Sequence, residues 1–126
     1  MTRSLILVGA GSCVGGISRY LTQQFIQKHY LSSIPLGTLC VNISGCFIIG
    51  IIYALANKGD ILSPEMRLLL ATGFCGGYTT FSSFAYENIS LLQDGEFFYT
   101  SLYVLLSVLI GFVAVYTGIL LIKLIS

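Results

Sequence analysis

The sequence predicts an all-α membrane protein with four transmembrane helices, and three observations support this prediction. The 126 residues are 56% hydrophobic and only 9% charged, and the mean hydropathy is +0.91. Because soluble domains carry about a quarter charged residues, this chain could not cover a water-facing surface. Four apolar segments each reach the roughly 20 residues that a span requires. Short polar stretches separate them, and the length predicts one domain over residues 1–126.

The four predicted spans follow one another with tight connections. They cover residues 4–25, 34–56, 66–92 and 97–122. The longest connection, residues 57–65, reads NKGDILSPE and combines charges with a glycine and a proline. Such stretches mark loops rather than elements. The third span is expected to be broken inside the membrane, because a glycine pair and several hydroxyl residues interrupt it.

Several classes of protein are excluded by composition. A net charge of +1 provides no basic surface, so no nucleic-acid partner is expected. His29 is the only histidine, and the spans contain no pair of carboxylates, so we expect no enzyme activity. The cysteines lie within the spans without a CxxC pair, which predicts packing residues rather than a metal or redox site. They are Cys13, Cys40, Cys46 and Cys75.

The N-terminal segment resembles two other kinds of segment that we set aside. Residues 1–16 place an arginine before an apolar run, as signal peptides do, but the apolar stretch continues and three more spans follow. The stretch LILVGAGSCVGG resembles a dinucleotide-binding loop, which requires an acidic residue about 20 positions later. The first acidic residue is Asp60. Gly11 and Gly15, four residues apart, are therefore interpreted as a surface for close helix packing.

Polar residues within the spans need a partner or a function, because hydrocarbon penalises them. Arg19 lies well inside the first span, and two interpretations stay open: a side chain that reaches the interface, or a functional group. Asn42 lies in the body of the second span, where an interhelical hydrogen bond is the favoured interpretation. Tyr103 and Ser107 share one face of the fourth span and suit interface packing or a polar pathway.

The stretch GFCGGYTTFSSF, residues 73–84, is the most unusual part of the chain. Gly76 and Gly77 weaken a helix by about 1 kcal/mol each relative to alanine, so we place the interruption there. A break of this kind frees carbonyl oxygens that can hold a cation. Phe81 and Phe84 follow on one helical face, surrounded by threonine and serine hydroxyls. Core packing explains most such pairs, but positive ring edges beside hydroxyl donors also suit a small anion.

Three stretches carry a family resemblance: GGISRY at 15–20, PLGTLCVNISGCFIIG at 35–50 and the stretch at 73–84. In motif order, length and layout the chain resembles the Fluc (CrcB) family of fluoride channels. The resemblance implies a fluoride-selective channel that exports fluoride passively and relieves its toxicity. It further implies a multi-pass protein of the bacterial plasma or inner membrane, assembled as an antiparallel homodimer in the lipid bilayer. A structural sodium ion at the dimer centre would be its cofactor.

The resemblance also implies roles for individual residues. The backbone carbonyls of Gly76 and Thr79 would bind sodium, and Arg19 and Gly77 would be structural. The anion pathway would comprise Asn42, Phe81, Ser82, Phe84, Tyr103 and Ser107. The family's fourth-span polar track would continue at Gly111 and Val115, whose side chains offer no hydrogen bonds.

Two other function classes remain as alternatives. A small four-span proton-coupled exporter of the multidrug-resistance type would need an ionisable proton carrier, for which only Glu87 is available. A non-transporting helper subunit would leave the polar interruption unexplained. Charge also bears on topology: with the N-terminus inside, most basic residues lie on the cytoplasmic side and Lys28 lies opposite. That bias favours one orientation, whereas an antiparallel homodimer needs both.

Overall fold

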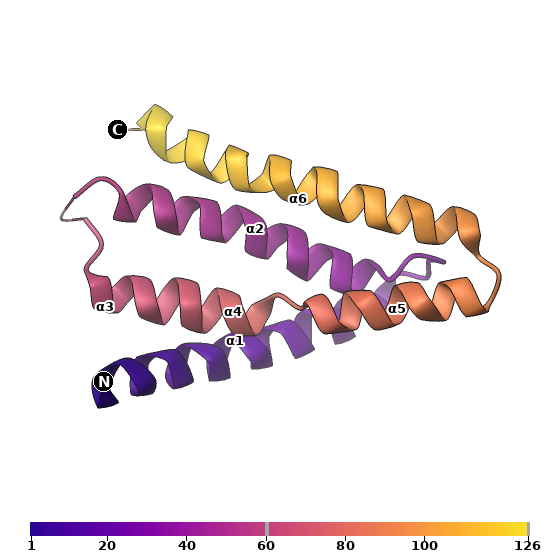
Figure 1. Ribbon diagram of the computed structural model, residues 1–126, viewed down its shortest axis with the longest axis horizontal. Helices are drawn as coiled ribbons and strands as arrows, with labels where there is room; N and C mark the ends of the chain where they lie inside the picture. Colours follow the sequence, from indigo (N-terminus) through magenta and orange to yellow (C-terminus); the bar gives the residue numbers. More distant parts are fainter. Residues whose placement is uncertain (60, 126) are drawn as a thin grey trace.

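The fold is a helix bundle in which each long segment runs in the opposite direction to the one before it (Figure 1). The computed structural model describes residues 1–59 and 61–125, and within these ranges every regular element is helical (Figure 1). Three helices are long: α1 (Thr2–His29), α2 (Leu36–Ala56) and α6 (Phe97–Ile125). Within the described residues, these three are long and apolar enough to cross a membrane. The prediction of an all-helical protein is therefore confirmed, and helices long and apolar enough to span a membrane coincide with three of the predicted spans, at 4–25, 34–56 and 97–122.

The third predicted segment, 66–92, consists of shorter pieces. They are α3 (Pro64–Arg67), the π-helical segment η1 (Leu68–Cys75), α4 (Gly76–Tyr78) and α5 (Phe81–Gln93). The first three join without a gap. Ser63 begins this run, because its side-chain oxygen accepts a 3.1 Å hydrogen bond from the Met66 N–H, and Pro64 occupies the first turn.

Two extended residues separate α4 from α5. Thr79 has φ −87° and ψ 158°, and Thr80 has φ −148° and ψ 119°. The glycine pair is helical, with φ −62° and ψ −36° at Gly76, so the irregular backbone begins at Thr79, two residues after the predicted pair. Threonine favours this geometry because its hydroxyl competes for backbone hydrogen bonds. The Thr79 hydroxyl donates to the Cys75 carbonyl at 2.9 Å.

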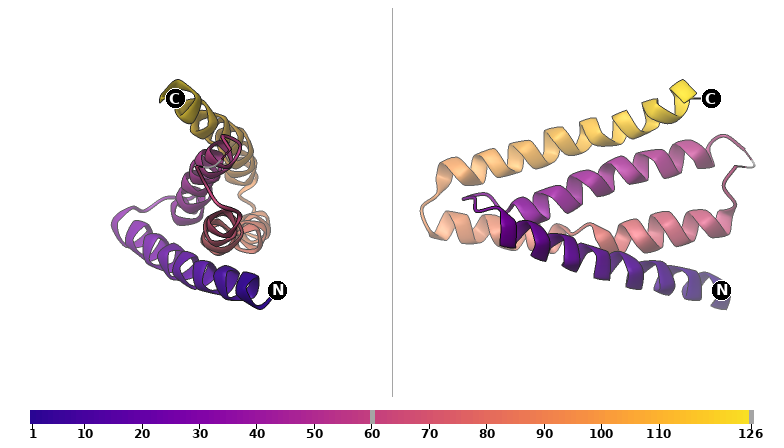
Figure 2. Two further views of the ribbon diagram at one scale, coloured as in Figure 1. Left: turned by 90° about the vertical axis from the view of Figure 1, so that its left-hand side faces the viewer. Right: turned by 180° about the vertical axis from the view of Figure 1, so that it is seen from behind.

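Glycines let α1 approach the η1–α4 run closely, and Figure 2 shows the two segments crossing. A Cβ added at Gly11 would lie 2.9 Å from the Gly73 Cα, and one added at Gly77 would lie 2.6 Å from the Ser12 carbonyl oxygen. A Cβ at Gly15 would meet the Phe74 carbonyl. The predicted packing surface at Gly11 and Gly15 is therefore confirmed, and Gly77 has a packing role.

One core cluster lies between α2, α5 and α6, where Tyr103 is completely buried, and a second joins Ile52 of α2 to Ala71 and Cys75 of η1. The helix α2 packs along α6 through glycines. A Cβ at Gly118 would lie 3.0 Å from the Ile51 N atom, and one at Gly50 would meet the Val115 carbonyl. The N-terminus, the α2–α3 connection and the end of α6 lie at one end of the bundle, and the α1–α2 and α5–α6 connections lie at the other (Figure 1).

A matched pair of methyl additions tests the α1 packing. Gly15→Ala places a Cβ against the Phe74 carbonyl, whereas Gly16→Ala meets no atom within 4 Å. We expect Gly15→Ala to lower the free energy of unfolding by about 1–3 kcal/mol, as overpacking does. Gly16→Ala should leave it unchanged or raise it slightly, because alanine favours helix. Thermal unfolding in detergent measures both, and equal unfolding temperatures for the two variants would contradict the packing.

Candidate functional site

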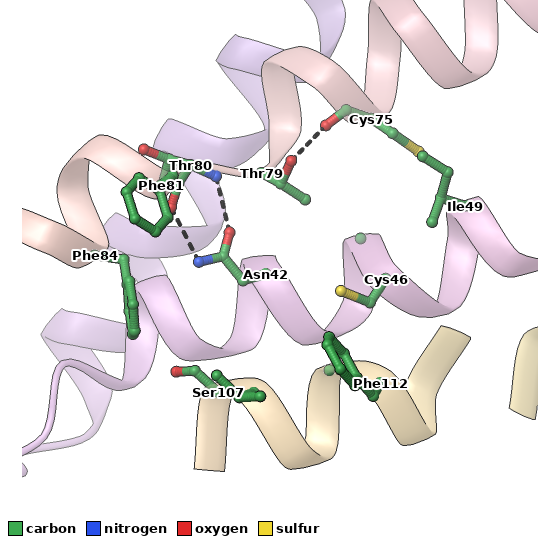
Figure 3. A pocket seen from close by; sticks show the side chains of 13 residues that line it. Asn42, Cys46, Ile49, Cys75, Thr79, Thr80, Phe81, Phe84, Ser107 and Phe112 are labelled. Atoms are coloured by element: carbon green, nitrogen blue, oxygen red, sulfur yellow. Dashed lines mark hydrogen bonds between the residues drawn. The ribbon is translucent and has the colours of Figure 1, made fainter. Parts of the chain in front are cut away.

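A groove of about 400 Å³ lies between α2, α6 and the break after α4 (Figure 3). Several residues predicted for the site line it: Asn42, Thr79, Phe81, Phe84 and Ser107. Thr80 also lines it, although the sequence analysis gave this residue no specific role. The sides of the groove are mostly apolar, and no charged side chain is among the described residues that line it.

Asn42 holds the extended backbone at the break. Its Nδ2 donates to the Thr80 carbonyl at 3.1 Å, and its Oδ1 accepts from the Thr80 N–H at 2.8 Å (Figure 3). Both bonds connect α2 to the broken segment, which confirms the favoured interpretation of Asn42 as an interhelical hydrogen-bonding residue. An amide nitrogen carries two hydrogens. One N–H of Asn42 is therefore not used by the bond to Thr80.

The hydroxyl of Thr80 begins α5. It accepts a hydrogen bond from the Ser83 N–H at 3.2 Å, as an N-cap residue does. The hydroxyl of Ser82, which is exposed, lies 3.3 Å from the same oxygen. The start of α5 thus places two hydroxyl groups beside the groove.

The two phenylalanines lie next to each other, but their environments differ. Their ring centroids are 5.9 Å apart, Phe81 is 78% exposed and Phe84 is half-buried. The ring of Phe84 meets that of Tyr103 edge-on, with centroids 5.0 Å apart and an interplanar angle of 65°. Tyr103 therefore fixes one side of Phe84, whereas Phe81 has an open face.

Glu87 is the centre of a polar cluster at the α5–α6 side of the fold. The Tyr103 hydroxyl donates to its Oε1 at 2.8 Å, and the Thr38 hydroxyl donates to its Oε2 at 2.7 Å. From the sequence, Glu87 is expected only as a possible proton carrier, and these two donors are not predicted. An isolated carboxylate in an apolar segment was the available signal, because such a group needs hydrogen-bonding partners.

Arg19 connects this cluster to the break. Its Nε donates to the Gly77 carbonyl at 3.1 Å, and its Nη1 lies 3.5 Å from the Gln23 Oε1. Gln23 in turn donates to the Thr38 hydroxyl at 3.0 Å. The position of this contact is favourable, because a cation stabilises the carbonyl end of a helical run. The structural role that the resemblance implies for Arg19 stays a prediction.

Ser107 and Gly111 of α6 line one side of the groove. The Ser107 hydroxyl is buried and has no hydrogen-bond partner among the described residues, and Ser107 is one of the residues that line the groove. Gly111 lines the groove without a side chain, and Val115 packs its backbone against α2. Of the four positions of the predicted track, only Tyr103 and Ser107 carry side chains that can form hydrogen bonds.

Of the two predicted cation residues, Thr79 is half-buried and lines the groove, whereas Gly76 is exposed and is not among the residues that line it. Within the described residues, no group of three or more His, Cys, Asp or Glu side chains could hold a metal. Cys75 is buried beside Ile52, whereas Cys13 and Cys40 are exposed on the outer surface of the helices.

Comparison with known proteins identifies similar sequences along nearly the entire chain. The family described as CrcB-like protein, Camphor Resistance (CrcB), matches residues 6–119. A protein of Chlorobium phaeobacteroides (strain BS1), named fluoride-specific ion channel FluC, is 51% identical over 96% of this chain and 94% of its own length. Proteins of the same name from Gloeothece citriformis and Leptospira interrogans are 45% and 39% identical, over 94% and 97% of this chain and 96% of their own lengths.

Removing one hydroxyl tests the Glu87 cluster. Tyr103→Phe leaves Oε1 of Glu87 without its donor inside the core, and we expect the free energy of unfolding to fall by about 1.5–3 kcal/mol. Tyr116→Phe removes a hydroxyl from the exposed side of the same helix and should have little effect. Thermal unfolding of both variants in detergent measures the difference. A Tyr103→Phe protein as stable as the Tyr116→Phe protein would show that the hydrogen bond contributes nothing.

Proposed function

Since this chain belongs to the CrcB family, we propose that it is a membrane channel that conducts fluoride passively and so relieves fluoride toxicity. The observation that carries the proposal is the identity of 39–51% with proteins named fluoride-specific ion channel, over nearly the full length of each chain. The family consists of channels and not enzymes. Fluoride enters cells as the neutral acid and is trapped as the anion, so a passive path lowers its cytoplasmic concentration.

The groove provides the groups that fluoride requires. Fluoride is small and strongly hydrated, so a pore must replace the hydrogen bonds of water with fixed donors. Candidates are the free N–H of Asn42 and the hydroxyls of Ser82 and Ser107, with the positive ring edges of Phe81 and Phe84 beside them. The lining lacks a charged side chain among the described residues. Binding is therefore weak enough for the ion to leave, as conduction requires.

In this proposal the run from α3 to α5 is the third of four spans, interrupted inside the membrane at Thr79 and Thr80. Two features support this arrangement. The run lies alongside α2 in the opposite direction, and it joins the two ends of the bundle (Figure 1). Irregular backbone is tolerated at membrane depth where protein buries it or a cavity faces it. Here the Asn42 side chain pairs with the irregular backbone from the protein side, and the groove is the cavity that the backbone faces.

The functional unit is proposed to be an antiparallel homodimer in the bacterial inner membrane. Within one chain the groove is open to the surface, and the aromatic rings beside it are exposed, Phe81 at 78% and Phe112 at 74%. A second copy would cover these rings and close the pathway against lipid. The basic residues favour one orientation, with Arg3, Lys58, Arg67 and Lys123 at one end and Lys28 at the other. A bias of this size shifts the populations without eliminating the minor orientation.

The proposed cofactor is a sodium ion bound by the Gly76 and Thr79 carbonyls, and the backbone hydrogen bonding at the break fits it. In a continuous helix these two carbonyls would accept from the N–H groups of Thr80 and Ser83. Those N–H groups donate to the Asn42 and Thr80 side chains instead. Two copies would bring four such oxygens together. The ion would be the partner of these carbonyl oxygens, because a buried carbonyl without a partner costs about 1–3 kcal/mol of stability.

The alternatives gain no support. A proton-coupled exporter would use Glu87 as its carrier, but both oxygens of this carboxylate accept hydrogen bonds from core residues. The relatives described above are named channels, and none of their names indicates an exporter. A helper subunit would not need the hydroxyl groups that line the groove.

Fluoride efflux from liposomes tests the function. Reconstituted protein should release fluoride rapidly under a potassium–valinomycin voltage clamp, with little chloride release, as an ion-selective electrode measures. An imposed proton gradient should not change the rate. Folded protein that releases no more fluoride than empty liposomes would refute the proposal.

Variants in the same assay test the lining. Phe84→Ile should lower the rate by about two- to tenfold, because oriented aromatic contacts contribute about 0.5–1.5 kcal/mol. Asn42→Asp should lower it further, since a carboxylate repels an anion in a site of low dielectric. Phe98→Ile, which removes an exposed ring at the far end of α6, is the control. Equal rates for all of these proteins would make Phe84 and Asn42 packing residues only.

Gly76→Val tests the dimer and its cation. Within one chain, a Cβ at Gly76 meets only the Ala71 carbonyl oxygen, at 4.0 Å, so the substitution should not disturb the subunit itself. In sodium we expect the parent to be dimeric and the variant largely monomeric, as measured by crosslinking in detergent. In a large organic cation the parent should also lose dimer, and the variant should not change. A parent dimer that is insensitive to the cation would refute the sodium site.

A further inference from the structure

Asn42 uses both ends of its amide on a single peptide unit. Its nitrogen donates to the carbonyl of Thr80, and its oxygen accepts from the N–H of the same residue, at 3.1 and 2.8 Å. This reciprocal pair reproduces the two bonds that neighbouring antiparallel strands exchange. A side chain of α2 thereby takes the place of a strand beside an extended residue. The pair stabilises Thr80 in the extended conformation, in which it cannot continue α4.

The consequence for the backbone is specific. The N–H group that Asn42 accepts is the one that a continuous helix would donate to the Gly76 carbonyl. One turn later, the Thr80 hydroxyl accepts from the Ser83 N–H, the group that a helix would donate to the Thr79 carbonyl. Two side chains therefore remove the helical donors of two carbonyls. These are the same two carbonyls to which we assign the sodium ion.

We infer that Asn42 and Thr80 are positioning residues for the cation site, in addition to any contact they make with the anion. This inference rests on the proposed function, because it concerns the sodium ion assigned there. It assigns to Asn42 a role different from that of a pathway donor. The amide maintains the break from α2, and the break presents the carbonyls. The groove that faces the anion and the backbone that faces the cation thus depend on the same side chain.

The two roles predict different phenotypes. A residue that only contacts the anion affects fluoride flux and leaves the affinity for sodium unchanged. A residue that positions the carbonyls changes the sodium concentration at which the folded protein is stabilised, even when no fluoride is present. The test therefore measures the unfolding temperature of purified protein without fluoride. Sodium chloride replaces N-methylglucamine chloride stepwise, at constant ionic strength.

The variants separate the two side chains. Asn42→Ala removes both bonds to Thr80, and Thr80→Val removes the cap of Ser83 with little change in shape. Each should raise the sodium concentration for half-maximal stabilisation by about five- to tenfold, the effect of one hydrogen bond on an equilibrium constant. Thr80→Ser keeps the hydroxyl and should restore the parent value. Thr117→Val removes an exposed threonine hydroxyl from α6 and serves as the matched control.

The outcomes distinguish this inference from the proposed function. If sodium stabilises the parent, and Thr80→Val needs the same sodium concentration as the parent for half-maximal stabilisation, the positioning role is wrong and the sodium site stands. If the parent shows no response to sodium, both the site and the positioning role are wrong. Should Asn42→Ala fail to fold, the Thr80→Val and Thr80→Ser pair still decides the question. A shift in Thr80→Val that Thr80→Ser reverses supports the inference.

Discussion

The two hydrogen bonds between Asn42 and the Thr80 peptide are the interaction on which the rest of the site depends. Hydrocarbon supplies no water to satisfy an interrupted helix, so every backbone group at a break must find a partner within the protein. The α2 amide satisfies the N–H and the carbonyl of the same residue. The Thr80 hydroxyl then caps the N-terminus of α5. Irregular backbone therefore persists where a simple span would be a continuous helix.

A second set of polar contacts holds the helices around this break. Arg19 contacts the Gly77 carbonyl and, through Gln23 and Thr38, is connected to Glu87. Arg19 and Glu87, both half-buried, are thus linked through neutral side chains. Such partners stabilise partly buried charges, because removing a charge from water is costly. The set ties α1, α2 and α5 together, and Tyr103 adds α6.

These constraints explain how a neutral lining suits fluoride. Arg19 and Glu87 form hydrogen bonds with neutral groups nearby. The groove therefore presents an amide, hydroxyls and ring edges. In the proposed pathway, donors that are held in place before the ion arrives would replace its hydration shell, and the absence of a fixed positive charge would let the ion leave. Close glycine contacts between α1 and the η1–α4 run give this arrangement a rigid base.

The sequence by itself determined the class of protein, the three long spans and the glycine surface of α1, because hydrophobic length and small-residue spacing are local signals. It also indicated that Asn42 would bond to another helix. Only the tertiary structure decided which atoms Asn42 and Arg19 contact, that Glu87 accepts two core hydroxyls, and that the extended residues are Thr79 and Thr80 and not the glycine pair. Propensity disfavours glycine in a helix, yet here Gly77 stays helical where Ser12 packs against it. The bonds that decide the break join residues 38 positions apart, a separation that no local pattern encodes.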